Sequence, residues 1–243
     1  MTGKTLRRNR RCLLLGRRRV LQGLAAGASA LVLPAGLREA LAAVSPDIAI
    51  RLVTTPDRVS IWPGIATRVV RFKAEVLQGR PDALRPMTSY LGPTLELRRG
   101  ERVRIQFINH TNEPSTVHWH GMIVPDGAAD GHPRLAVGPG QSYTYDFTVN
   151  NPAGTYLYHP HPHGRTGRQI YAGLAGLLIV RDDGERAAGL PSAERELDLI
   201  IQDRRVDANG QFVYKRMMMD EMSGVLGDTV LVNGANAVLY DPK

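Results

Sequence analysis

The sequence predicts an all-β protein whose strands form a Greek-key β-sandwich. From residue 44 onward, short strand-like segments follow one another with no long stretch of helical periodicity. Turn signals such as Arg99-Gly100 and Pro139-Gly140 separate these segments. About eight short strands at this spacing are typical of an antiparallel β-sandwich.

We expect these strands within residues 44–183. Apolar and polar residues alternate most clearly in residues 142–149 and 103–107, which is the pattern of a half-buried strand. The expected strands cover residues 48–53, 67–76, 94–96, 102–109, 115–120, 142–149, 155–159 and 174–181.

The sequence also predicts a second, shorter region. Residues 184–195 have little periodicity, and we expect them to be an interdomain linker. Residues 197–202, 211–214 and 229–233 then have the character of opening strands of another sheet. The roughly fifty residues from 196 to 243 are too few for a sandwich to bury a core. We therefore expect an incomplete second domain, or an appendix that packs on the first.

The basic residues are concentrated at the N-terminus. The formal net charge is +8, from 31 basic and 23 acidic residues. Nine of the basic residues and one of the acidic residues lie within residues 1–42, which leaves 22 of each for the rest. The charge therefore reflects a leader segment, and no nucleic-acid partner is expected.

Residues 1–43 have the features of an export signal. An Arg-rich start precedes an apolar, small-residue run over 20–37, and Ala40-Leu41-Ala42 is similar to a cleavage site. Residues 16–22 (GRRRVLQ) resemble a twin-arginine box, which predicts passage through the twin-arginine export machinery to the periplasm or cell exterior. An ordinary secretory signal or an uncleaved anchor is the alternative. Polar and helix-breaking residues within the run disfavour stable membrane insertion.

Histidines are concentrated in two short motifs. Six of the seven lie between His118 and His163, including the H-x-H pairs His118/His120 and His159/His161. In a strand, residues two apart point to the same face, so each pair presents two imidazoles side by side. Neutral imidazole is a strong ligand for copper and zinc. Two such pairs on adjacent strands would direct four nitrogens into a volume large enough for more than one metal ion.

Both motifs resemble the copper motifs of the multicopper oxidases, the family of laccases, bilirubin oxidases and bacterial copper-efflux oxidases. Residues 116–121 (TVHWHG) are similar to the first motif. Residues 154–161 (GTYLYHPH), continued by 173–180 (GLAGLLIV), are similar to the second motif and the strand after it. The similarity extends across most of residues 85–183. It implies a plastocyanin-like cupredoxin domain over residues 44–183.

The start of a second cupredoxin domain over residues 196–243 is implied as well, because residues 231–234 (LVNG) are similar to an early second-domain stretch. By the same resemblance, His118 would bind the type 2 copper of a trinuclear cluster. His120, His159 and His161 would bind its type 3 pair. Dioxygen would be reduced to water at this cluster.

Asp130 has two interpretations. The family places an Asp-Gly after its first motif and uses the carboxylate to deliver protons near the cluster, and dioxygen reduction consumes protons. Equally, Asp130 could cap its own loop, as the adjacent glycine suggests.

Other conspicuous residues are expected to have structural roles. His163 lies outside the ligand pair, and we expect it to support the ligands or to lie at the surface; His132 is expected to be structural. Trp119 should face away from the neighbouring histidines, into the core. Met217, Met218 and Met219 cannot all face one ion, so core or interface packing is favoured over copper binding.

The chain departs from the family in one respect. A complete multicopper oxidase takes its other trinuclear ligands and its type 1 site from a C-terminal domain with H-x-x-H-x-H and H-C-H motifs. Neither motif occurs here, no histidine follows His163, and the single cysteine, Cys12, lies in the leader. We expect a fragment, since the second domain stops mid-pattern at Pro242-Lys243, or a cluster that another chain completes.

These observations favour an exported copper oxidoreductase. It would take single electrons from a small reducing substrate, such as a phenol, a bilirubin-like pigment or cuprous ion, and pass them to dioxygen. This chain alone would be inactive, because four ligands do not satisfy three coppers. One alternative is a non-catalytic protein of the same fold, such as the copper-free periplasmic protein that supports cell division. A periplasmic module that binds copper or zinc is another.

Overall fold

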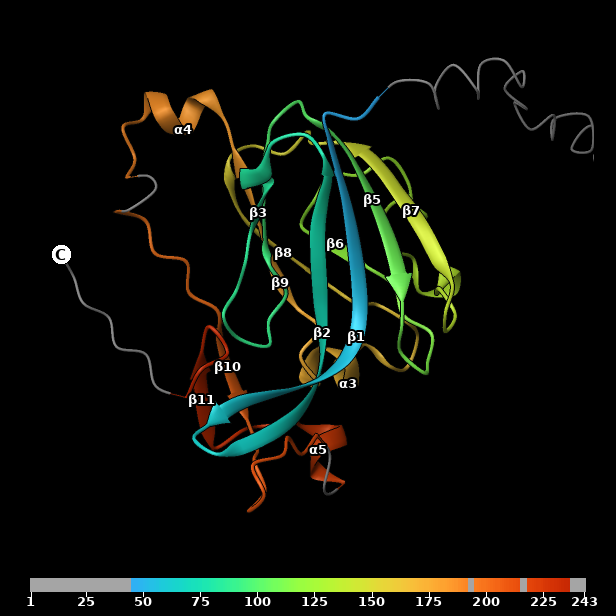
Figure 1. Cartoon of the computed structure of the whole chain (residues 1–243), viewed down its shortest axis with the longest axis vertical. Coiled ribbons are helices and arrows are strands. Elements are labelled where there is room, and N and C mark those ends of the chain that lie inside the picture. Colours follow the sequence, from blue (N-terminus) through green and yellow to red (C-terminus); the bar gives the residue numbers. More distant parts are fainter. Residues whose placement is uncertain (1–44, 192–194, 215–217, 237–243) are drawn as a thin grey trace, which may run out of the picture. The chain divides into compact units, whose positions relative to one another are not determined.

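Two β-sheets packed against each other form the main body of the chain (Figure 1). The computed structural model describes residues 45–191, 195–214 and 218–236, so the expected leader and Met217 lie outside the described residues. The first sheet has the strand order β2-β1-β5-β7 and the second has the order β3-β4-β9-β8-β6. The strands of the first sheet are β1 (Ile48–Trp62), β2 (Ile65–Gln78), β5 (Arg102–Asn109) and β7 (Ser142–Thr148). Those of the second are β3 (Leu84–Arg85), β4 (Thr94–Arg98), β6 (His118–His120), β8 (Gly154–His159) and β9 (Gly176–Arg181).

The expected β-sandwich is confirmed, but its pairing is mixed rather than antiparallel throughout. Strand β5 runs parallel to β1, and β9 runs parallel to β4. After β2 the chain crosses to the second sheet for β3 and β4, and only then returns to the first sheet at β5. A strand that arrives by such a crossover can lie parallel to its neighbour, whereas a hairpin connection forces the antiparallel direction.

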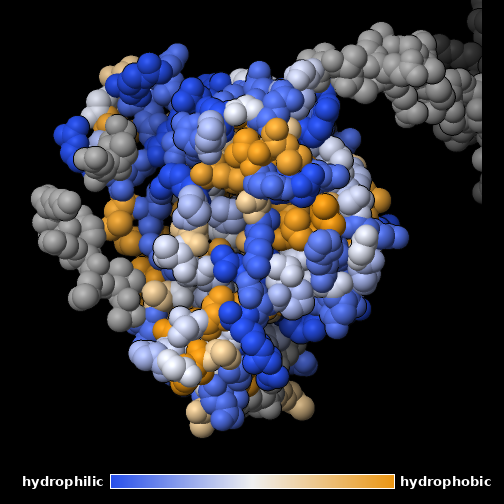
Figure 2. Space-filling view, viewed as in Figure 1, coloured by the Kyte–Doolittle hydropathy of each residue, from blue (hydrophilic) through white to orange (hydrophobic). Residues whose placement is uncertain are grey.

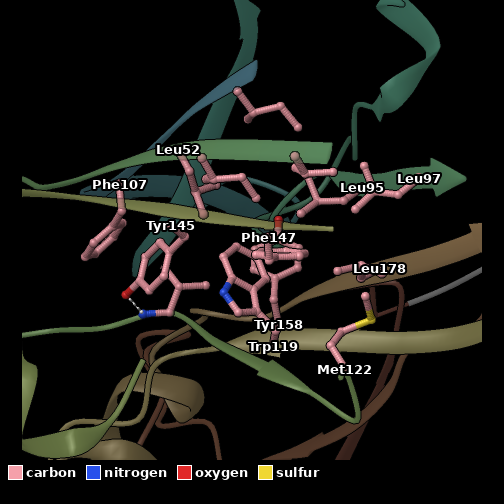
Figure 3. Close-up of a cluster of buried hydrophobic side chains, with 14 of the residues drawn as sticks. Leu52, Leu95, Leu97, Phe107, Trp119, Met122, Tyr145, Phe147, Tyr158 and Leu178 are labelled. Carbon is pink, nitrogen blue, oxygen red and sulfur yellow. Dashed lines mark hydrogen bonds between the residues drawn. The ribbon is translucent and has the colours of Figure 1, made fainter. Parts of the chain in front are cut away.

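The core lies between the two sheets. Strand β5 shows the alternation expected of a half-buried strand, with Val103, Ile105 and Phe107 fully buried. Figure 3 shows Trp119 and Tyr158 of the second sheet beside Tyr145 and Phe147 of the first. Burying side chains of this size contributes roughly 1.5–3 kcal/mol each. The same core fixes the strands that carry the histidine motifs.

All eight strands expected before residue 184 are present, and most of them differ in length from the expected segments. Strands β1 and β2 are much longer than the segments 48–53 and 67–76, and their hairpin extends beyond the sandwich toward β10 and β11 (Figure 1). Strand β6 is shorter than 115–120, because Ser115 pairs with Val137 instead of continuing the ladder. The sequence has no long stretch of helical periodicity, and the helices present are short: α3 (Thr166–Tyr171), α4 (Asp183–Ala187) and α5 (Met219–Met222), with 3-10 turns at Pro81–Ala83 and Pro133–Leu135.

A small third sheet follows the sandwich. Strands β10 (Ile201–Arg204) and β11 (Thr229–Val232) pair antiparallel, as the segments 197–202 and 229–233 predicted in part. The prediction of a strand at 211–214 is wrong. Phe212 makes only an isolated bridge to Val206, and its ring packs edge-on against Tyr90. Phe212 therefore serves this contact rather than a ladder.

One side of the third sheet is buried and the other is exposed. Leu231 is fully buried beside Val69, Tyr90 and Leu91, whereas Ile201 is 69% exposed. Figure 2 shows a mainly hydrophilic face interrupted by hydrophobic side chains. Among the described residues, no helix has both the length and the apolar character that crossing a membrane requires.

Candidate metal centre

Strands β6 and β8 carry the two histidine motifs and pair with each other. In their antiparallel register His118 lies opposite His159, and Trp119 lies opposite Tyr158. Because side chains alternate along a strand, the histidines share one face while Trp119 and Tyr158 enter the core. Both aromatic residues are fully buried, so the predicted core role of Trp119 is confirmed.

Three of the imidazoles lie close together. His120 Nδ1 is 3.1 Å from His159 Nε2. The ring centroid of His118 lies 5.5 Å from that of His120 and 5.2 Å from that of His159. One ring nitrogen from each of the three lies within 4.8 Å of the others. This spacing suits a shared metal, because imidazole nitrogens bind such ions at about 2.0–2.1 Å.

His161 joins the group from beyond the end of β8. Its ring centroid lies 5.2 Å from that of His118 and 6.3 Å from that of His159. Its Nδ1 is buried and has no hydrogen-bond partner in the described part of the chain. The structure therefore brings all four predicted ligand residues to one place.

Burial favours the neutral form of His159. His159 is only 7% exposed, and this burial lowers the pKa of its imidazole from the ordinary value of 6.5. The neighbouring His118, His120 and His161 lower this pKa further, against the opposing effect of the Pro160 carbonyl. His159 Nδ1 donates to that carbonyl at 3.0 Å, which leaves the lone pair on Nε2 facing His120. A neutral imidazole fixed in this tautomer is the form that binds metal.

Asp130 lies beside His118. His118 Nδ1 is 3.1 Å from the Asp130 carbonyl oxygen and 3.0 Å from its carboxylate Oδ1. The carbonyl meets the geometry of a hydrogen bond, and the buried Oδ1 has no hydrogen-bond partner within the described residues. The loop itself is capped by Asp126, whose carboxylate accepts from the Ala129 N–H at 2.8 Å. The contacts of Asp130 thus point toward His118, and the capping role falls to Asp126.

Gly131 allows this approach. Its φ is +67°, and a Cβ at this position would lie 2.0 Å from the Val117 carbonyl oxygen. Only glycine combines this backbone conformation with so close a contact. The loop can therefore pass directly over the residue that precedes His118.

A small pocket opens next to the histidines. It has a volume of about 100 Å³ and is lined by His118, Gly127, Asp130, Gly131, His132, Pro133 and His161. His132 is exposed, and its Nδ1 accepts from the Arg134 N–H at 3.2 Å, in line with the structural role expected of it. His163 is exposed.

The donor set fits copper. Four imidazoles meet without a thiolate, and this nitrogen-only set suits copper or zinc rather than magnesium or calcium. The buried Nδ1 of His161, which lacks a partner among the described residues, is a donor atom of the kind that a metal would satisfy.

Core or interface packing was expected of the methionines. Met218 and Met219 are 78% and 56% exposed, so core packing is wrong for these two, while interface packing stays a prediction. Thr116 and Gln169, two buried polar residues that contact the segments carrying the histidines, were not singled out from the sequence. Thr116 is the first residue of the first motif, but nothing in the sequence shows that its hydroxyl accepts from the backbone N–H of His161.

Comparison with known proteins agrees with this geometry. Residues 82–185 match the family model of the multicopper oxidases. A multicopper oxidase from Staphylococcus aureus is 40% identical over 156 residues, which cover 63% of this chain and 32% of that protein. A cell division protein, FtsP, from Sodalis glossinidius is 37% identical over 150 residues, covering 61% of this chain and 31% of that protein. The chain thus spans about a third of the length of these curated relatives.

Solved structures give the same result. The McoA multicopper oxidase of Aquifex aeolicus matches with a TM-score of 0.65 and 35% identity, over 79% of this chain and 39% of that one. A laccase-like multicopper oxidase, CueO, from an Ochrobactrum species matches with a TM-score of 0.67 and 32% identity, over 77% and 39% of the two chains. These structures share the cupredoxin-like sandwich described above. By its sequence motifs, its fold and its relatives, this chain carries a domain of the multicopper oxidase family, matched over residues 82–185.

Proposed function

We propose that this chain supplies four imidazole ligands of a trinuclear copper cluster in an oxidase that reduces dioxygen to water. The observation that carries the proposal is the meeting of His118, His120, His159 and His161 at the paired ends of β6 and β8. In this assignment His118 binds the type 2 copper and the other three bind the type 3 pair. Copper held there would supply one-electron redox chemistry.

The residues of the chain prepare the site in distinct ways. The Pro160 carbonyl accepts from His159 Nδ1–H and so directs the lone pair of Nε2 into the cluster. The Asp130 carbonyl accepts from His118 Nδ1–H in the same way and so directs the lone pair of His118 Nε2. The Asp130 carboxylate then has a buried oxygen, Oδ1, that can hold a proton beside the ligands. We assign Asp130 this proton-delivering role.

Four imidazoles do not satisfy three copper ions, so we propose that the remaining ligands come from protein outside this sequence. No histidine follows His163, and Cys12 is the only cysteine. The polypeptide alone therefore lacks a type 1 site to accept electrons, and it is inactive as a laccase-like oxidase by itself. The electron donor is a small reducing molecule of the phenolic, pigment or cuprous class.

We place this protein in the periplasm or outside the cell. The support is the leader, with Arg17 and Arg18 inside a segment similar to a twin-arginine box. Replacing both by Lys in a fusion of the leader to a reporter should keep the reporter in the cytoplasm. Export of the variant fusion at the parent level would contradict this route.

The cell division relatives favour one alternative, a non-catalytic protein of the same fold. The four histidines argue against it, because a protein without copper has no need to bury His159 among three other imidazoles. A module that buffers copper without an oxidase is a further candidate. Such a module would need the same histidine ligands, but it would not need the further copper ligands that dioxygen reduction requires.

Copper titration of the purified chain tests the proposal. The parent should bind copper, and His120→Ala and His161→Ala should each weaken binding by an order of magnitude or more, as expected for the loss of a ligand. His163→Ala is the matched control, because His163 lies two residues beyond His161 but is exposed. Failure of the parent to bind copper excludes the oxidase and the buffering module together. Binding that survives both ligand variants contradicts the ligand assignment.

A further inference from the structure

His161 is held differently from the other three histidines. His118, His120 and His159 belong to β6 and β8, so backbone ladders fix their positions. Strand β8 ends at His159, and His161 lies beyond it. Its imidazole also falls outside the group of three whose nitrogens lie within 4.8 Å of one another. Something other than strand pairing must place this ring against His118.

The hydroxyl of Thr116 makes the first such contact. Thr116 precedes β6 and is fully buried, and its Oγ1 accepts a hydrogen bond of 2.8 Å from the backbone N–H of His161. This bond joins the two histidine motifs across 45 residues of sequence. The bond is partly buried, so the loss of its acceptor would leave the His161 N–H without this partner at a cost in free energy.

The side-chain amide of Gln169 makes the second set of contacts. Gln169 lies in helix α3, which follows the second motif, and it is only 3% exposed. Its Oε1 accepts from Ser115 Oγ at 2.9 Å, and its Nε2 donates to the Pro114 carbonyl at 2.9 Å. A third bond, of 3.1 Å, runs from Nε2 to Glu113. The segment before β6 is thereby tied to α3.

Between His161 and Gln169 the chain forms a short turn. Arg165 N–H and Thr166 Oγ1 both donate to the Pro162 carbonyl, which closes the turn that leads into α3. The loop that carries His161 is therefore tied at His161 and again at Gln169, each time to residues just before His118.

We propose that Thr116 and Gln169 are positioning residues that set the His161 imidazole against His118, so that the two motifs form one copper site. The inference rests on the copper binding proposed above. Neither side chain touches the metal; each acts through the backbone of the loop. The expected consequence is that the loss of either contact weakens copper binding through His161 alone.

An isosteric pair tests Thr116. Thr116→Val keeps the shape of the side chain and removes the hydroxyl, whereas Thr116→Ser keeps the hydroxyl. We expect copper affinity of the full chain to fall about 10-fold or more in Thr116→Val, the size seen when a group that orients a ligand is lost, and to recover in Thr116→Ser. In the His161→Ala background, Thr116→Val should have no further effect, because the contact acts through that residue.

A second pair tests Gln169. Gln169→Met removes the amide and keeps the length of the side chain. Gln202→Met is the matched control, since the Gln202 amide also accepts a hydrogen bond, from Tyr90 Oη–H at 2.6 Å, but on β10. Copper affinity should fall in Gln169→Met and stay at the parent value in Gln202→Met. In copper-free protein, faster hydrogen exchange of the His161 amide in Thr116→Val would show the loosened contact directly.

The outcomes separate the two proposals. A parent chain that binds no copper overturns the proposed function and, with it, the positioning role. A parent that binds copper with Thr116→Val at equal affinity overturns the positioning role alone. The positioning role is also overturned if Thr116→Val lowers copper affinity equally in the parent and in the His161→Ala background. That result would mark a general effect on the fold. The nitrogen hyperfine pattern of bound Cu²⁺ gives a check independent of affinity, and it should change in Thr116→Val as in His161→Ala.

Discussion

His120 Nδ1 and His159 Nε2 lie 3.1 Å apart on neighbouring strands. His159 Nδ1–H donates to the Pro160 carbonyl, so His159 Nε2 is the acceptor and His120 is the donor. The neutral form of His159 thus supplies the acceptor at Nε2, and protonation of Nε2 would remove this acceptor. This relationship links the protonation of one buried imidazole to the stability of the site.

The stability of the copper-free chain should fall in mild acid. Burial and the neighbouring imidazoles lower the pKa of His159 below 6.5, so in mild acid the unfolded chain binds a proton that the folded chain does not. The free energy of unfolding therefore decreases as the pH falls from 6.5 toward the folded-state pKa, and levels off below it. Urea unfolding of the parent and of His159→Gln across this range should give a flatter curve for the variant. Parallel curves would contradict the assignment.

Gly131→Ala should damage both the fold and the copper site. The new Cβ would meet the Val117 carbonyl oxygen at 2.0 Å, so the loop must shift and carry Asp130 away from His118. We expect a loss of more than about 2 kcal/mol in the free energy of unfolding, beyond the cost of the backbone conformation alone. Copper affinity should fall with it.

Gly140→Ala is the matched control for this change. Gly140 has a similar φ of +71°, but a Cβ there meets nothing within 4 Å. Its expected cost is therefore only that of the left-handed conformation, about 1–2 kcal/mol, with copper affinity unchanged. Equal losses in the two variants would show that the close approach of Gly131 to Val117 is unimportant.

Trp119→Ala should be among the most destabilising single changes in the sandwich. Trp119 is fully buried, and its ring centroid lies 5.4 Å from that of Tyr145 and 5.5 Å from that of Phe147. Truncating a buried Trp removes these contacts and leaves a cavity, at a cost of about 3–5 kcal/mol. Urea unfolding followed by circular dichroism measures it. Trp62→Ala, at a partly buried Trp, should cost clearly less, and a larger loss there would contradict this account of the core.

Tyr90→Phe should reduce the loss of stability in alkali. Burial raises the pKa of Tyr90 from 10.0 to about 12, although the nearby Arg204 opposes this rise. Between these values the unfolded chain releases a proton that the folded chain retains, so the stability of the parent declines as the pH rises from 10 to about 12. Tyr90→Phe removes this decline. It also removes the bond to Gln202, at a cost of about 1 kcal/mol near neutral pH. Absorbance of the phenolate locates the titration, and an unchanged alkaline profile would refute the role of Tyr90.

Local pattern in the sequence was enough to locate most strands. The alternating residues 102–109 have the bounds of β5, and those of 142–149 differ from β7 by one residue. The segment at 211–214 has a similar apolar character, but it forms no strand because Phe212 is used to pack against Tyr90. Short helices such as α3 were not visible, because six residues give too little periodicity to recognise.

The sequence by itself determined which residues could bind metal and which could enter the core, because the alternation of side chains is a local property of a strand. His118 and His120 had to share a face, and Trp119 had to take the other. Only the tertiary structure decided that His118 lies opposite His159, that Gly131 lets Asp130 reach His118, and that Thr116 and Gln169 hold the loop of His161. These relationships join residues far apart in the chain, and strand register and loop placement are set by the packing of the whole sandwich rather than by any short segment of it.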